Sequence, residues 1–104
     1  MIVSTTETIP QREITEILGV ARGSTVRARN FGRDILAGFK NLVGGEIDSY
    51  TKLQADSREQ AYERMLEDAK RLGADAVVNV RFATSMIMQG ASETLAYGTA
   101  VKLS

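Results

Sequence analysis

The stretch GRDILAGFKNLVGGEIDSYTKLQADSREQAYERMLEDAKRLGADAVV, residues 32–78, decides the fold. It contains a short helical pattern, a double-glycine break at Gly44-Gly45, a long helical pattern and a glycine stop at Gly73, followed by an apolar run from Ala76. Apolar residues recur at helical spacing in both patterns, and glycine readily adopts the left-handed conformation that ends helices. The stretch therefore predicts a helical unit that packs on β-structure formed by the two flanks.

Two helices are expected within this stretch. A short helix is predicted over residues 35–43, capped by Asn30 or Asp34, whose side chains accept hydrogen bonds from free helix N–H groups. A long helix follows over residues 46–72 because neither glycine nor proline interrupts it; a restart at Ser57, which forms a capping-box pattern with Gln60, is the alternative. The apolar stripe of the long helix consists of Ile47, Tyr50, Leu53, Ala61, Met65, Ala69 and Leu72.

The N-terminal flank predicts β-structure. Residues 1–6 form a short β-prone segment that ends before Pro10, which lacks an N–H for a β-ladder. Residues 13–30 form a second β region, in which Gly19 and Gly23 leave two interpretations open. Gly23-Ser24 is a turn between two strands, or the region is one bent strand with a bulge at a glycine.

The C-terminal flank predicts two further strands. The first begins at Ala76 as a strand covered on both faces and continues less clearly through residues 86–88. A turn over residues 89–92 leads to a last strand over residues 93–103, in which Gly98 allows another backbone to approach or marks a bulge. One face of this strand is predicted to carry Leu95, Tyr97, Thr99, Val101 and Leu103. The whole chain, residues 1–104, is thus expected to be one α+β domain, with an antiparallel sheet, both helices on one face and the order β-β-(β)-α-α-β-β.

The composition excludes several classes of function. Thirteen basic and thirteen acidic residues give zero net charge, which argues against a general nucleic-acid binder. The sequence has no cysteine and no histidine, so disulfides and catalysis by either residue are excluded. We read no signal peptide at the N-terminus and no apolar run long enough for a membrane span, and we expect a cytoplasmic protein that binds no membrane.

Arginines and acids near the glycines are the candidate ligand-binding residues. Arg27, Arg29 and Arg33 lie at a strand-to-helix junction, where an arginine cluster beside free N–H groups can hold an anion. The alternative is that Arg27 and Arg29 form the solvated face of a strand and that Arg33 pairs with an acid. Carboxylates near glycines suit hard ions such as Mg²⁺, or else cap helices; these acids are Asp34, Glu46, Asp48 and Asp75.

Several motifs, taken together, resemble the YbjQ family over almost the whole chain. They are GRDI (32–35), GGEI (44–47), Tyr50, Arg58, GADAVV (73–78), Arg81-Phe82 and YGTAV (97–101). The resemblance implies a small bacterial or archaeal protein of unknown function, described as heavy-metal-binding, whose α+β subunit assembles into a homopentameric ring. It supplies no catalytic residues. Without cysteine or histidine, a metal would have to rely on carboxylates, backbone carbonyls or the thioethers of Met65, Met86 and Met88.

The sequence leaves three hypotheses of function. The first is a non-enzymatic homo-oligomer, a pentamer, whose partner is itself and which binds an unknown ligand or serves a structural role. The second is a metal-ion binder; no other cofactor is evident. The third is an enzyme with a site between subunits, built from Arg33, Asp34, Glu46 and Tyr50. The ligand-binding candidates taken together are Arg27, Arg29, Arg33, Asp34, Glu46 and Tyr50.

Overall fold

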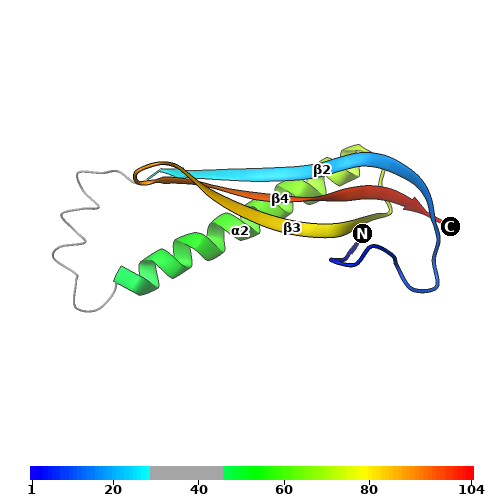
Figure 1. Cartoon of the computed structure of the whole chain (residues 1–104), viewed down its shortest axis with the longest axis horizontal. Coiled ribbons are helices and arrows are strands. Elements are labelled where there is room, and N and C mark those ends of the chain that lie inside the picture. The colour runs from blue at the N-terminus through cyan, green and yellow to red at the C-terminus, as the bar shows by residue number, and fades with distance from the viewer. Residues whose placement is uncertain (29–45) are drawn as a thin grey trace.

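The computed structural model describes residues 1–28 and 46–104 as an α+β fold, a four-stranded sheet with one long helix on one face (Figure 1). The strand order across the sheet is β1-β3-β4-β2. The predicted short helix over residues 35–43 lies outside the described residues. The elements are β1 (Ile2–Val3), β2 (Ile14–Ala28), α2 (Glu46–Arg71), β3 (Ala76–Met88) and β4 (Ala91–Leu103).

The sheet is mixed, so the prediction of a purely antiparallel sheet was wrong. β3 and β4 form an antiparallel hairpin, and β2 pairs antiparallel with β4, but β1 runs parallel to β3. The chain passes through β2 and α2 between β1 and β3, and a long crossover of this kind is what a parallel pair requires. The hairpin turn is shorter than predicted, because β4 already begins at Ala91 and Gly90 takes a positive φ of 81°.

β2 is a single strand, which confirms the bulged-strand interpretation and rejects the turn at Gly23-Ser24. Its pairing with β4 shifts register between Ile17 and Gly19, where Gly19 has a φ of 135°. Gly23 has a different role. A Cβ atom built there would lie 2.3 Å from the backbone nitrogen of Met65 in α2. The glycine therefore lets the helix backbone rest directly on the strand.

The long helix is continuous from Glu46 to Arg71, with no restart at Ser57. It ends at Gly73 as predicted: the glycine has a φ of 82°, and the next N–H, that of Ala74, donates to the carbonyl of Ala69 at 3.1 Å. This hydrogen bond belongs to the Schellman arrangement, which satisfies carbonyls left free at a helix end. Leu72, counted in the apolar stripe, is 37% exposed because it lies beyond the last helical residue.

The core lies between α2 and small residues of the sheet. Ala61, Met65 and Ala69 of the helix are fully buried against the sheet. In β4 the predicted face of Leu95, Tyr97 and alternate residues to Leu103 points away from the helix, while the intervening small residues form the helix-facing side. The small side chains let the helix approach closely. The sheet residues of this core are Ala21, Val77, Val80, Ala96 and Ala100.

Among the described residues, the opposite face of the sheet is covered only at one end. There Ala76, Val78, Val101 and Leu103 form a second buried cluster, against which Ile9 and Ile14 pack. The prediction that β3 begins as a strand covered on both faces is thus confirmed for residues 76–78 and 80. From Arg81 to Met88 the strand is exposed.

Candidate functional site

Of the six predicted ligand-binding residues, only Arg27 has a side chain within the described part of the structure. Glu46 and Tyr50 lie in the first turns of α2, for which the structure describes the backbone only. Arg29, Arg33 and Asp34 lie outside the described residues. The anion site and the enzyme site between subunits therefore remain predictions.

Arg27 is engaged with the helix. It lies near the end of β2, opposite Ser92 of β4, and is half-buried. Its Nε–H donates to the hydroxyl of Ser57 in α2 over 3.3 Å, and Ser57 is only 3% exposed. A hydroxyl buried beneath the helix thus receives a charged donor from the sheet. In the described residues, Arg27 links β2 to α2.

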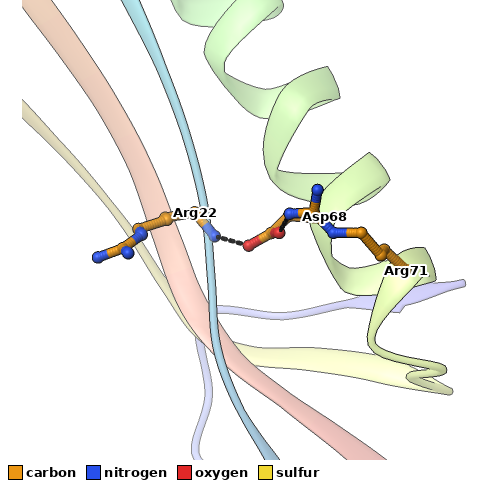
Figure 2. Close-up of polar contacts among 3 residues, drawn as sticks. All are labelled: Arg22, Asp68 and Arg71. Atoms are coloured by element: carbon orange, nitrogen blue, oxygen red, sulfur yellow. Dashed lines mark hydrogen bonds and ion pairs between the residues drawn. The ribbon is translucent and has the colours of Figure 1, made fainter.

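A second polar contact joins the same two elements and was not anticipated from the sequence. The carboxylate of Asp68 in α2 accepts a hydrogen bond from the backbone N–H of Arg22 at 3.0 Å and forms an ion pair with Arg71 (Figure 2). The N–H of Arg22 has the largest effect and favours the charged carboxylate, burial opposes it, and the guanidinium of Arg71 favours it further. The net result is that the pKa of Asp68 lies below its ordinary value. Glu67 lies four residues before Arg71, a spacing typical of helix ion pairs, but Arg71 pairs with Asp68 instead.

The helix also makes a hydrogen bond to a second backbone group on the outer edge of β2, the edge that does not face β4. Arg64 donates from Nη1 to the carbonyl of Ser24 at 2.6 Å. Arg64 and Asp68 are four residues apart, so they lie on the same side of the helix, and Arg22 and Ser24 are two apart, so their backbone groups point to the same side of the strand. The sequence shows that Arg64 and Asp68 are spaced to lie on one side of a helix. It does not show that both side chains bond backbone groups of β2.

The face of the sheet opposite α2 exposes large apolar side chains. Ile17 is 71% exposed, Val20 60% and Val26 56%. Tyr97, at 38%, lies in a cross-strand row between Arg22 and Arg81. This helix-free face, defined by Ile17, Val20, Val26 and Tyr97, extends over β2 and β4. No described element covers it.

The tip of the β3–β4 hairpin is also exposed and carries two of the methionines considered as metal ligands. Met86 is 80% exposed and Met88 65%, whereas Met65 is fully buried in the core. The register pairs Met86 with Ser92 and Met88 with Ala91. Successive residues of β4 face opposite sides, so the two thioethers emerge on opposite faces of the hairpin and do not converge in one subunit.

Carboxylates do not gather into a metal centre in the described residues. Over residues 1–28 and 46–104 there is no group of three or more acids that could hold an ion. Asp75, one of the acids near a glycine, accepts the backbone N–H of Leu103 at 2.9 Å and lies 4.0 Å from Lys102. It acts as a structural acceptor for β4 at the end of the sheet, and this contact is not the predicted helix cap.

In the part of the chain that the structure describes, no helix is both long and apolar enough to cross a membrane.

These features define a class of small α+β protein in which one long helix covers one face of a mixed sheet and leaves much of the other face open. The YbjQ_1 family model, with the description "Putative heavy-metal-binding", matches residues 1–104. The chain belongs to this family, as the sequence motifs had suggested.

Relatives in archaea and bacteria are proteins of similar length named UPF0145. A UPF0145 protein of Archaeoglobus fulgidus is 64% identical over 99% of this chain and 95% of its own. A UPF0145 protein of Vibrio campbellii is 59% identical over 99% of both chains. A crystal structure of a protein of unknown function from Pediococcus pentosaceus matches with a TM-score of 0.68 over 100% of this chain and 98% of that one, at 16% identity. At that identity the likeness shows the fold alone.

Proposed function

We propose that this protein is the subunit of a homopentameric ring that acts as a binding or structural module and not as an enzyme. The observation that carries the proposal is the helix-free face. Ile17, Val20 and Val26 are more than half exposed and lie on one side of one strand. Arg22 and Ser24 lie between Val20 and Val26 on this side, so the face combines apolar and polar side chains. Large apolar side chains exposed on one face are a feature of interaction sites in soluble proteins.

The energetics favour association of like chains. Removing a large aliphatic side chain from water contributes roughly 1.5–3 kcal/mol when burial is complete. Burying the exposed parts of Ile17, Val20 and Val26 therefore contributes a few kcal/mol per subunit. The zero net charge of the chain leaves little long-range repulsion between copies.

Location and partners follow from the same reasoning. The proposal places the ring in the cytoplasm, because disulfides are rare there and this sequence has no cysteine. Its partner is another copy of the chain, with neither nucleic acid nor membrane as a target. Arg27 stays in the proposal as a ligand-contacting residue, because it lies near the end of β2 and the one hydrogen bond of its side chain to the described residues is that of Nε to Ser57.

A metal-binding function is the second candidate, favoured by the description of the family model. Met86 and Met88 are solvent-accessible thioethers, the ligand type that selects soft ions such as Cu⁺. They face opposite sides of one hairpin, so a site would need thioethers from more than one subunit. Metal bound only by the assembled protein would support this candidate.

Analytical ultracentrifugation over a concentration series tests the assembly proposal. Val20→Lys places a charge on the helix-free face, and the expected result is at least a tenfold weaker association than wild type. Glu63→Lys is the matched control, because Glu63 is exposed on the opposite side of the molecule, on α2. Unchanged association of the Val20 variant would contradict the proposal that this face is buried between subunits.

A further inference from the structure

The outer edge of β3 is divided into a covered half and an open half. N-terminal residues cover the first half: the N–H of Ser4 donates to the carbonyl of Val77 at 2.9 Å, and the N–H of Val80 donates to the carbonyl of Ser4 at 3.0 Å. Beyond Val80, no described strand pairs with this edge. The open half runs from Arg81 to Met88.

The other edge of the sheet, formed by β2, is already protected. In α2, Asp68 accepts the hydrogen bond of the Arg22 N–H, and Arg64 donates to the carbonyl of Ser24. Nearer its start, β2 has register shifts up to Gly19, which disturb its regular backbone spacing. Helix contacts and bulges are two of the means by which proteins block unwanted strand pairing at a sheet edge.

The open half of β3 lacks both kinds of protection over much of its length. Its register with β4 is regular from Arg81 to Met86. The N–H of Arg22 points away from β4, to Asp68, so the backbone groups of its β4 partner Tyr97 point to Arg81 of β3. From Arg81 on, backbone direction alternates, so the N–H groups of Phe82, Thr84 and Met86 point outward. All residues from 81 to 88 are exposed. This stretch can therefore accept a further strand.

The chemistry of the edge fits a second copy of this chain. Arg81 is the one charged residue of the open half, and residues 82–92 contain no charged side chain, so pairing beyond Arg81 buries no charge. Phe82 is 48% exposed and Met86 80%, so the edge carries its own apolar surface. The edge belongs to the same sheet as the helix-free face that the proposed function assigns to contact between copies.

We infer that a second copy of this chain adds a strand to the outer edge of β3 between Arg81 and Met86, so that the sheet continues across the subunit boundary. The inference rests on the proposed assembly and names one of its contacts. Strand pairing supplies direction and register, which an apolar face alone does not fix.

Amide hydrogen exchange on the assembled wild-type protein tests the inference directly. The outward amides of Phe82, Thr84 and Met86 are expected to exchange as slowly as the inward amides of Ala83 and Ser85, which face β4. Rapid exchange of the outward amides in an assembled protein would overturn this inference and leave the proposed assembly intact. A monomeric wild-type protein would overturn both.

A proline substitution supplies a second test. Thr84→Pro removes an outward N–H and spares the ladder with β4; at least a tenfold loss of association is expected. Thr84→Val is the matched control, because it changes the same side chain but keeps the N–H, and it is expected to assemble like wild type. If the Thr84→Pro variant does not fold, Thr84→Lys replaces it, since lysine also blocks edge pairing. Wild-type association of the Thr84→Pro variant, or an equal loss in Thr84→Val, would refute the inference.

Discussion

Gly23→Ala should destabilise the protein severely, although it adds a single methyl group. A Cβ atom at this position would lie 2.3 Å from the nitrogen of Met65, 2.4 Å from the oxygen of Ala61 and 2.6 Å from the carbonyl carbon of Arg64. All three are backbone atoms of α2, so a change of side-chain rotamer cannot relieve the clash. Reaching ordinary contact would require the helix and β2 to separate by about 1 Å across the tightest-packed part of the core.

The expected cost follows from that separation. Overpacking a well-packed core costs about 1–3 kcal/mol, and the upper end applies because the contacts are with backbone. For a chain of this length, about 3 kcal/mol corresponds to a fall in melting temperature of roughly 12–18 °C. Thermal unfolding followed by circular dichroism, at matched protein concentrations, measures this difference.

Gly73→Ala is the control for the effect of replacing a glycine as such. Nothing lies within 4 Å of a Cβ built at Gly73, but its φ of 82° disfavours alanine. A cost of about 1 kcal/mol is expected from the backbone alone. If Gly23→Ala proved no more destabilising than Gly73→Ala, the close seating of α2 on β2 would be wrong.

Other predictions concern the contacts around α2. Asp68→Asn weakens the acceptor for the Arg22 N–H and should cost about 1–2 kcal/mol in urea denaturation; Glu67→Gln, at an exposed neighbouring position, should cost nothing measurable. Because the pKa of Asp68 is lowered on folding, its contribution is present above the unfolded pKa near 3.8 and is lost as pH falls through the lower folded value. The stability of wild type should therefore fall more steeply than that of Asp68→Asn in this acid range, and parallel curves would contradict the assignment. Tyr62→Ala removes the ring stacked on Phe82 at 6.5 Å and should cost about 1 kcal/mol beyond the loss of buried area, tested by a double-mutant cycle with Phe82→Ala. Met65→Ala empties a fully buried position and should cost about 2–5 kcal/mol by the same denaturation assay, and a smaller loss would mean that the core collapses into the space.

The sequence predicted the fold well where local pattern sufficed. The helical spacing of Ala61, Met65 and Ala69 identified the buried side of α2, and Gly73 identified its end. The parallel partner of β1 was missed, because strand pairing between residues more than seventy positions apart leaves no local signal. The choice between a turn and a bulge in β2 depended on α2 resting on Gly23, which is a tertiary contact.

The candidate site was less predictable than the fold. Arg27 was selected for its charge, but its Nε contact with Ser57 depends on the angle at which α2 crosses β2. The alternation from Leu95 to Leu103 suggested one apolar face, yet α2 packs on the small residues of the opposite face. Apolar side chains were therefore left exposed on the helix-free face, and only the three-dimensional arrangement revealed this surface.

Native mass spectrometry of freshly purified wild-type protein, with metal analysis of the same sample, is the most direct test of self-assembly. We predict the mass of a pentamer, and stoichiometric metal in that pentamer would identify the ligand class as well. A monomer at micromolar concentration would contradict the assembly, and with it the strand pairing proposed at β3.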